Sequence, residues 1–452
     1  MAENPDSVGS DGNRYSSAHP APGVLKRLTM NAGMLLGGKT VGGILALVYT
    51  ALAVRAIGIE AYGTLTLIQA YTLVICQALS LNGSNSVLRY GTGLVQQANY
   101  ARFRQLVGFT ACLDFASGLL AAAVAVTGTA WIGDLLGWPT AITPWAALYA
   151  TTAVVMMRGR TPNGVLRLFD RFDLLAIRPT IQAVIRLAGA ALVFFFDLGL
   201  PAILVAWFLA RLTRDLYVLI ASYHELSTRA LTPTFHGLRS VPKNLTRFWS
   251  FVVKTNLNNS ARLIQGQSIP LLIGGVMTNS AVGLFQVARQ LTQATMQPIQ
   301  SMRPAIYPEL ARLISHGDRL RLKRLVLRSA GIAAATAVTG LSLLALTGGW
   351  LLWAIGGSQA VAAYTLMLLL ATANVLRLTA FPIQPLLISM GHPGHALAAQ
   401  LVSAAAQIGG LLILVPYLGL EAAGVAAILA ALSIIAYQFT AAGRLWQRSL
   451  AT

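Results

Sequence analysis

Charged residues are scarce in this chain of 452 residues, since they make up 10% of it while hydrophobic residues make up 56%. A soluble domain carries about 25% charged residues, and so few ionised groups cannot cover a soluble surface of this size. The scarcity excludes an ordinary soluble protein and indicates an integral membrane protein.

Cysteine and acidic residues are also rare. The two cysteines, Cys76 and Cys112, both lie in apolar runs. A disulfide framework is therefore excluded, and we interpret both thiols as packing residues. Asp and Glu together number 14 against 33 Lys and Arg, which gives a formal net charge of +19.

Motifs of enzyme chemistry are missing. The six histidines fall in the N-terminal tail or in predicted loops, without the acidic or thiol neighbours of a metal site. The acids of the predicted outer loops stand singly, and the GGKT of residues 37–40 lacks the preceding glycine of a phosphate-binding loop. The sequence predicts a protein that is not an enzyme and has no cofactor and no metal.

Apolar runs of about 20 residues, the length that crosses a bilayer core, recur along the chain. Residues 1–29 are polar, have no cleavable signal pattern and are expected to form a disordered cytosolic tail. Twelve transmembrane helices are expected at 30–56, 61–88, 105–129, 142–166, 174–196, 200–221, 248–275, 280–307, 327–347, 361–389, 394–416 and 421–443. A cytosolic loop, 222–247, separates an N-lobe of residues 30–221 from a C-lobe of residues 248–452. The predicted fold is an all-α polytopic membrane protein.

The predicted loops carry charge asymmetrically. Loops that follow odd-numbered spans hold no Lys or Arg, whereas those that follow even-numbered spans are basic, and the C-terminus ends with Arg444 and Arg448. The positive-inside rule then places both termini in the cytosol. Topology accounts for much of the positive charge, so a nucleic-acid partner is excluded.

The two lobes show weak internal similarity. Residues 55–73 match residues 275–292 at an offset of 220 residues, which places Gly63 on Gly283. An even number of spans per repeat keeps both repeats in the same orientation, an arrangement found in transporters whose site lies between the halves.

Ionised residues inside the predicted spans are almost all basic. An ionised group at the bilayer centre is costly, so such residues normally face a bundle interior or a hydrated cavity. The alternative is snorkelling, in which a long basic side chain reaches from near a helix end to the membrane interface. Lys39 and Arg289 lie too deep in their spans to favour it, whereas it stays open for the cations of spans 7 and 10. We count six cations against the single acid Asp114: Lys39, Arg186, Lys254, Arg262, Arg289 and Arg377.

Amides accompany these cations at helical spacing. They can tie helices together by hydrogen bonds, but span 8 carries more of them than packing requires, which favours a hydrated cavity. Amides suit hydroxyl-rich ligands and cations suit phosphate, so together they indicate a sugar attached to a phosphate or diphosphate on a lipid. The candidates are Gln69, Asn258, Gln265, Gln286 and Gln293, with a further stripe of Gln400, Ser403 and Gln407 on span 11.

Several stretches resemble a known family. Residues 31–65, with an early Asn-Ala-Gly and a G-x-E-A-Y-G turn, are similar to the polysaccharide flippases related to O-antigen flippases. Residues 164–187 and the AVGLFQVARQL of residues 281–291 agree with that resemblance, as do residues 304–325. These flippases belong to the multidrug/oligosaccharidyl-lipid/polysaccharide exporter superfamily.

The resemblance implies two six-helix lobes around a central cationic cavity. It also implies alternating access that moves undecaprenyl-diphosphate-linked oligosaccharide to the outer leaflet of the bacterial inner membrane, for O-antigen or exopolysaccharide synthesis. Lys39, Lys254, Arg262 and Arg289 are the positions that would hold the diphosphate, and Asp114 is the residue available for ion coupling. The expected partners are the lipid-linked oligosaccharide, the bilayer and a glycan polymerase or copolymerase.

Two other functions were weighed. A cation-coupled multidrug extruder on the same fold would be expected to place acids in its lobes, whereas the deep charges here are basic. A membrane-bound glycan polymerase would need a sizeable outer loop, and the predicted outer loops are short. The flippase interpretation is therefore preferred.

Overall fold

The computed structural model describes residues 22–81, 83–238, 241–245, 247–300, 313, 319–389 and 393–451. Within these ranges the chain is helical, with short 3-10 and π segments and no strand, which confirms the all-α prediction. Six helical segments of the described residues are long and apolar enough to cross a membrane: Thr40–Gln96, Tyr100–Leu135, Thr140–Leu168, Phe172–Phe196, Leu320–Val361 and Leu397–Arg444. The count of twelve spans stays a prediction.

The helices follow the expected spans closely in most places. The first half of the chain forms α1 (Pro22–Ala78), α2 (Gly83–Ser86), α3 (Thr92–Gln96), α4 (Tyr100–Leu135), α5 (Thr143–Ala150), α6 (Thr152–Arg158), α7 (Arg160–Leu168), α8 (Phe172–Phe196), α9 (Gly199–Thr228) and α10 (Val241–Asn244). The second half forms α11 (Phe248–Val276), α12 (Asn279–Gln300), α14 (Arg319–Val361), α15 (Tyr364–Thr379), α16 (Ile383–Ser389), α17 (Pro393–Leu418) and α18 (Ala422–Ala451).

Local sequence explains where several helices begin, end or bend. The Asn99 side chain caps α4 by accepting a hydrogen bond from the Arg102 amide at 3.3 Å. The long helix α1 bends at Gly58, whose φ of 80° and ψ of 165° suit only glycine. A second long helix, α14, bends at Gly356 and Gly357 in the same way. Each long helix therefore consists of two straight segments.

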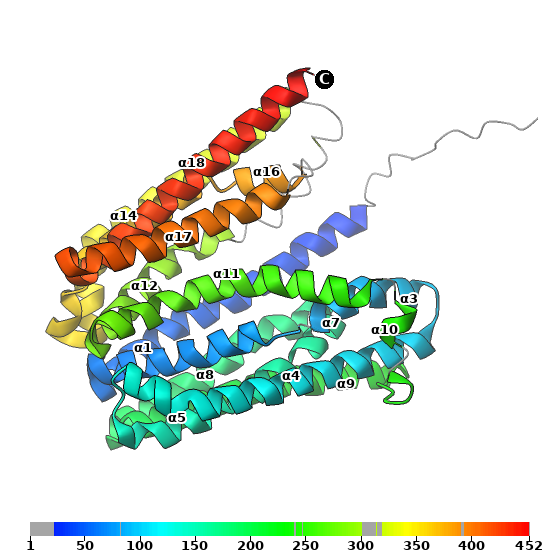
Figure 1. Ribbon diagram of the computed structural model, residues 1–452, viewed down its shortest axis with the longest axis horizontal. Coiled ribbons are helices and arrows are strands. Elements are labelled where there is room, and N and C mark those ends of the chain that lie inside the picture. The colour runs from blue at the N-terminus through cyan, green and yellow to red at the C-terminus, as the bar shows by residue number, and fades with distance from the viewer. Residues whose placement is uncertain are drawn as a thin grey trace, which may run out of the picture.

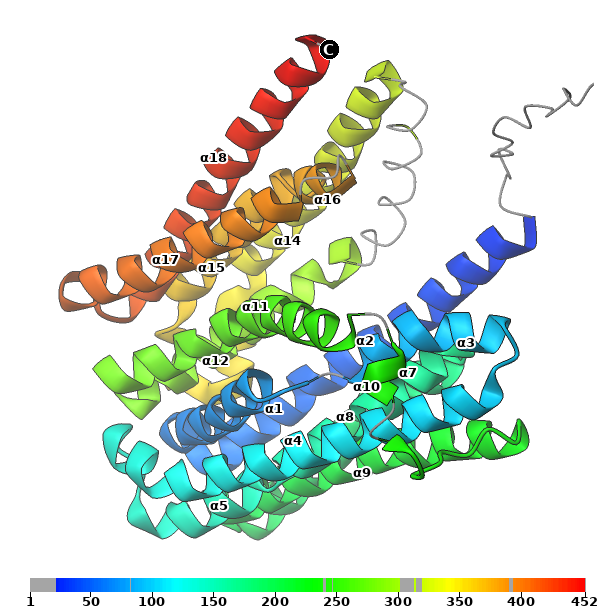
Figure 2. The ribbon, with the colours of Figure 1, turned by 45° about the vertical axis from the view of Figure 1, so that its right-hand side comes forward.

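The helices form two groups that diverge toward one end of the molecule (Figures 1 and 2). One group contains α1 and α4 to α9, and the other contains α14 to α18. Helices α11 and α12 lie between them, and both pack against α1. The groups approach most closely near the bends of α1 and α14, and they separate toward the end that carries the C-terminus.

One apolar core joins the two groups. Leu65 of α1, Trp207 of α9, Ile273 of α11, Phe285 of α12 and Met367 of α15 are all buried in it. Burial of this surface, at about 25 cal/mol per Å² for apolar area removed from water, holds the groups together at the closed end.

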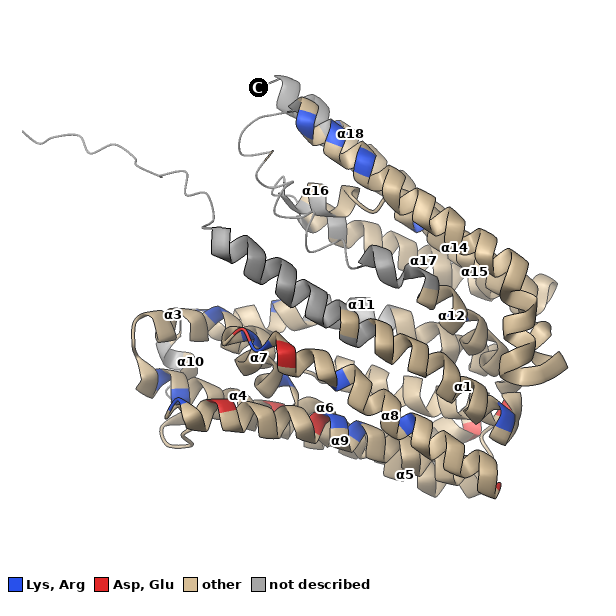
Figure 3. Ribbon diagram, turned by 180° about the vertical axis from the view of Figure 1, so that it is seen from behind, with Lys and Arg blue, Asp and Glu red and all other residues tan. Residues whose placement is uncertain are grey.

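Basic residues gather at the opposite, divergent end. Figure 3 shows Lys and Arg at the end of α18 and around α3 and α10, on the side that carries the C-terminus. Arg89, Arg102, Arg247 and Arg444 are exposed there. This distribution matches the pattern on which the predicted orientation rests.

Helices α1 and α12 cross at two glycines that the internal repeat relates. A Cβ on Gly63 would lie 1.8 Å from the Asn279 carbonyl oxygen, and a Cβ on Gly283 would lie 2.2 Å from the Ile59 carbonyl oxygen. Ile59 and Asn279 are themselves 220 residues apart, so the contact is reciprocal across the repeat. Only glycine allows the backbones to approach this closely.

We predict that Gly63→Ala and Gly283→Ala destabilise the protein by about 1–3 kcal/mol, because the added methyl group overlaps backbone atoms that cannot move independently. Thermal unfolding of the purified protein in detergent measures the effect. Gly331→Ala on α14 is the control, since a Cβ there meets nothing within 4 Å. If all three variants unfold at the same temperature, α1 and α12 do not cross at this distance.

Candidate functional site

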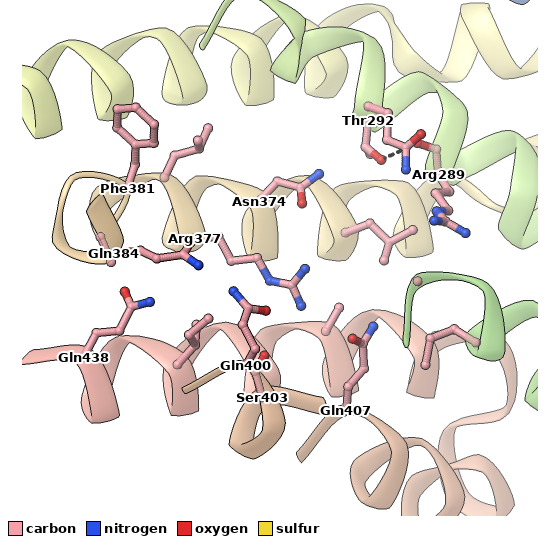
Figure 4. A pocket seen from close by; sticks show the side chains of 18 of the residues that line it. Arg289, Thr292, Asn374, Arg377, Phe381, Gln384, Gln400, Ser403, Gln407 and Gln438 are labelled. Carbon is pink, nitrogen blue, oxygen red and sulfur yellow. Dashed lines mark hydrogen bonds between the residues drawn. The ribbon is translucent and has the colours of Figure 1, made fainter. Parts of the chain in front are cut away.

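A cavity of about 580 Å³ lies among the helices of the second half of the chain. Its described lining residues come from α11, α12, α15, α16, α17 and α18 and from the turn after α15, and none of these described residues comes from α1 to α9. Figure 4 shows the polar side chains that point into it from these facing helices. The described lining therefore comes from α11 and α12, which lie between the two groups, and from helices of the second group. The expected central cavity stays a prediction.

The charge of this cavity is positive. Arg289 of α12 and Arg377 of α15 line it, and no Asp or Glu is among its described lining residues. The Nε and Nη2 atoms of Arg377 are buried, and neither has a hydrogen-bond partner among the described residues. A guanidinium group enclosed in an apolar protein is costly unless water or an anion meets it. The cavity is therefore suited to an anionic ligand.

The neutral part of the lining is rich in amides. Thr292 donates a hydrogen bond to the Arg289 carbonyl at 2.8 Å, and Ser403 donates one to the Ala430 carbonyl at 2.9 Å, so both hydroxyl protons are used within the protein. Each amide can both donate and accept, which suits the hydroxyl groups of a sugar. The amide side chains are Gln293, Asn374, Gln384, Gln400, Gln407 and Gln438.

The structure brings some of the predicted site residues together in this cavity. Arg289, Arg377 and Gln293 line it, and so does the predicted stripe of α17, where Arg377 extends toward Gln400 and Gln407 (Figure 4). Gln286 on α12 is half-buried and is not part of the lining.

Other predicted residues lie elsewhere. Lys254 is exposed on α11, and Gln69 is half-buried on α1. The side chains of four more candidates lie outside the described residues: Lys39, Asn258, Arg262 and Gln265.

Sequence reasoning missed part of the lining. Asn374 precedes Arg377 by three residues on α15 and so shares its face. Gln384 and Gln438 are single amides in otherwise apolar runs. A lone amide carries no periodic pattern, so the only signal was its isolation among apolar neighbours.

The comparison with known families agrees with these features. A family model described as polysaccharide biosynthesis protein matches residues 92–359. The chain belongs to this family. Inner membrane protein YghQ of Escherichia coli K12 is 27% identical over 294 residues, which is 65% of this chain and 82% of YghQ.

Solved structures place this polysaccharide biosynthesis protein in a transporter fold. The inward-facing conformation of a multidrug resistance MATE family transporter of the MOP superfamily has a TM-score of 0.75 at 13% identity, and the match covers 90% of this chain and 96% of that one. A MOP superfamily transporter from Pyrococcus furiosus, described by a reversed polarity of its binding pocket, has a TM-score of 0.66 at 15% identity and covers 93% and 95%. Family and fold together support a membrane exporter or flippase.

Arg186 of this polysaccharide biosynthesis protein lies on α8 and is not among the described lining residues of the cavity. Its side chain is buried, donates a hydrogen bond to the Tyr49 hydroxyl at 3.1 Å and lies over the rings of Tyr49 and Trp207. The structure therefore does not bring Arg186 together with Arg289 and Arg377.

The expectation of a single intramembrane acid is wrong. Asp215 of α9 is buried and accepts hydrogen bonds from Arg178 at 2.9 Å and from Arg214 at 2.6 Å. Both pairs are ion pairs: Arg178 joins α8 to α9, whereas Arg214 precedes Asp215 on α9 itself. Asp215 directly follows Arg214 in the predicted span 200–221. The basic residues of this span were assigned to no site and no loop, and the acid beside them was missed.

Asp114 of α4 is fully buried and held by three hydrogen bonds. It accepts them from the amide of Gly83 at 3.0 Å, the amide of Thr161 at 2.9 Å and the hydroxyl of Thr161 at 2.6 Å. The carboxylate thus fastens α2 and α7 to α4, at a distance from the cavity lining. Its use in ion coupling stays a prediction.

We predict that Asp215→Asn lowers the free energy of unfolding by about 3 kcal/mol, since it leaves the half-buried guanidinium groups of Arg178 and Arg214 without their buried counter-charge. Chemical or thermal unfolding in detergent measures the loss. Asp134→Asn on α4 is the matched control, because that carboxylate is exposed. Equal stability of the two variants would contradict a structural role for the Asp215 pairs.

Proposed function

We propose that this protein is a flippase that moves an undecaprenyl-diphosphate-linked oligosaccharide from the inner to the outer leaflet of the bacterial inner membrane. The observation that carries the proposal is the cavity with Arg289, Arg377 and six amides, in which none of the lining residues that the structure describes is an acid. Guanidinium groups bind phosphate oxygens in pairs of parallel hydrogen bonds, and amides bind sugar hydroxyls. A head group that combines phosphate with sugar matches both sets of side chains.

The family and the fold support this proposal. Polysaccharide synthesis needs lipid-linked sugar units outside the membrane, and a transporter fold of two helix groups can expose a site to each side in turn. The TM-score is 0.75 with an inward-facing conformation and 0.61 with an outward-facing conformation of a MATE family transporter. The divergence of the two groups toward the basic, terminus-bearing end fits a cytosolic opening.

The proposal extends to parts of the chain beyond the cavity. We place twelve transmembrane helices in lobes of residues 30–221 and 248–452, joined by a cytosolic segment of residues 222–247, with both termini in the cytosol. Further cations and amides would line the route of the head group between the lobes: Lys39, Lys254, Arg262, Gln69, Asn258, Gln265 and Gln286. A glycan polymerase or copolymerase would receive the translocated unit.

A multidrug extruder is the second candidate, because solved neighbours include multidrug transporters. A cationic drug needs acids or an uncharged aromatic surface to replace its hydration. The described part of this lining holds two cations and no acid, and like charges would repel such a drug. The sign of the charge therefore favours the lipid-linked glycan.

We expect Arg377→Gln and Arg289→Gln each to slow transport by about tenfold or more, because each removes a charge-assisted hydrogen bond to phosphate. The measurement is leaflet exchange of a fluorescent undecaprenyl-diphosphate-linked sugar in proteoliposomes. Arg55→Gln is the control, since Arg55 is exposed on α1 and lies outside the cavity lining. Exchange by the wild type that both cavity variants retain would discard the site, and no exchange by the wild type would discard the function.

We also expect the membrane potential to assist export. Moving one charge across 100 mV changes the free energy by about 2.3 kcal/mol, so a substrate with two net negative charges gains about 4.6 kcal/mol on leaving a negative-inside compartment. The rate of outward translocation should therefore rise when a potassium diffusion potential is applied to the proteoliposomes. A rate that is the same with and without the potential would contradict charge-driven export.

A further inference from the structure

An arginine at the basic, divergent end of the molecule lies against aromatic rings and not against an acid. Arg89 is exposed on the short π-helical segment Val87–Gly91, which follows α2. Its guanidinium carbon is 4.3 Å from the centroid of the Phe251 ring of α11 and 5.6 Å from that of the Tyr90 ring. Stacking uses the face of the guanidinium group, so the N–H donors at its edge stay open to a further ligand.

Two further cations flank the same ring on α11. Arg247 directly precedes this helix, and its carbonyl accepts a hydrogen bond from the Phe251 amide at 3.0 Å. Lys254 follows Phe251 by three residues, a spacing that puts two side chains on one helical face. Both cations are exposed. Within the part of the chain that the structure describes, neither they nor Arg89 form an ion pair with an acid. Three positive charges thus lie about one helical turn or less from Phe251 without a described counter-charge.

Neighbouring apolar side chains indicate that this patch lies where the membrane meets water. Trp249 and Val253 are 47% and 54% exposed, one turn apart on α11, and the Trp249 ring lies 6.3 Å from that of Phe109 on α4. Exposed tryptophan is typical of the level of lipid head groups, and basic residues gather at the cytosolic side. Figure 3 shows this end as the basic one. With the termini in the cytosol, as proposed above, the patch meets head groups of the inner leaflet.

We propose that Arg89, Arg247 and Lys254 bind the phosphate of an anionic glycerophospholipid of the inner leaflet. Arginine donates paired hydrogen bonds to phosphate oxygens, and lysine adds a point charge. A net negative lipid is favoured, because the ammonium group of a zwitterionic lipid would face three cations. Neither residues 247–255 nor Val87–Gly91 include an Asn or Gln, whereas the cavity has six amides. The patch therefore suits a phosphate without a sugar.

The bound phosphate connects two separate parts of the fold. Arg89 lies on the segment that follows α2, whereas Lys254 lies on α11. These parts also meet through Tyr90, whose ring centroid is 5.7 Å from those of Phe248 and Phe251. A phosphate between the cations offsets the repulsion of like charges across this contact, so lipid binding stabilises the folded protein.

The test compares thermal unfolding of the full-length protein in dodecyl maltoside with added phosphatidylglycerol and with added phosphatidylcholine. Phosphatidylglycerol should give a saturable rise in Tm of about 2 °C, because a ligand that binds only the folded state stabilises it, and phosphatidylcholine should not. Arg89→Gln and Lys254→Gln should each remove most of this rise. Arg444→Gln is the matched control, since it removes the same charge from an exposed position at the same end, on α18, and it should retain the rise.

The transported lipid is the competing occupant, and a second measurement separates the two. Undecaprenyl diphosphate is added to Arg377→Gln, in which the cavity has lost one of its cations, and to the double variant that also carries Arg89→Gln. A rise larger than that with phosphatidylglycerol, lost in the double variant, would assign the patch to the transported lipid and overturn the proposal. The proposal also fails if both phospholipids give the same rise or if Arg89→Gln keeps the whole of it. Because neither readout involves transport, the result is independent of the proposed flippase function.

Discussion

The cost of placing positive charge inside an apolar protein is the constraint on which the rest of this structure depends. A guanidinium group removed from water loses several kcal/mol of solvation unless a counter-charge, hydrogen bonds or water replace it. Three arrangements meet this cost here. Arg178 and Arg214 share the buried carboxylate of Asp215, Arg186 lies against Tyr49 and Trp207, and Arg289 with Arg377 borders a polar cavity. The positive charge of arginine thus forms an ion pair in the first arrangement, an aromatic contact in the second and the wall of a cavity in the third.

The two halves of the chain use their charges differently although the internal repeat relates them. The cations of α8 and α9 are enclosed among aromatic rings and a carboxylate, which fixes these helices to one another. The cations of α12 and α15 face a cavity with six amides, where a ligand can reach them. A buried ion pair resists rearrangement, whereas an unpaired cation beside a cavity attracts an anion. The first half therefore encloses its cations, and the second half carries the candidate site.

Sequence reasoning succeeded where the signal is local. Helix positions follow from runs of apolar residues, and Gln293 and Arg289 share a face of α12 because their spacing of four residues brings them together. It failed where the partner comes from another helix. Arg186 looks like Arg377 in the sequence, and only the packing of α8 against α1 and α9 separates a residue enclosed by Tyr49 and Trp207 from one that faces a cavity. The isolated amides Gln384 and Gln438 meet only because α16 and α18 pack together.

The glycine crossing of α1 and α12 shows which property of the repeat has been kept. Gly63 meets the Asn279 carbonyl and Gly283 meets the Ile59 carbonyl, so each copy of the repeat contributes the same pair of positions. A contact made by backbone atoms does not depend on side-chain chemistry. The two copies can therefore share this contact although the interiors of the two halves differ in charge. It also lies at the end where the two groups are closest. The close approach that glycine allows therefore sets how near α1 and α12 lie at this crossing.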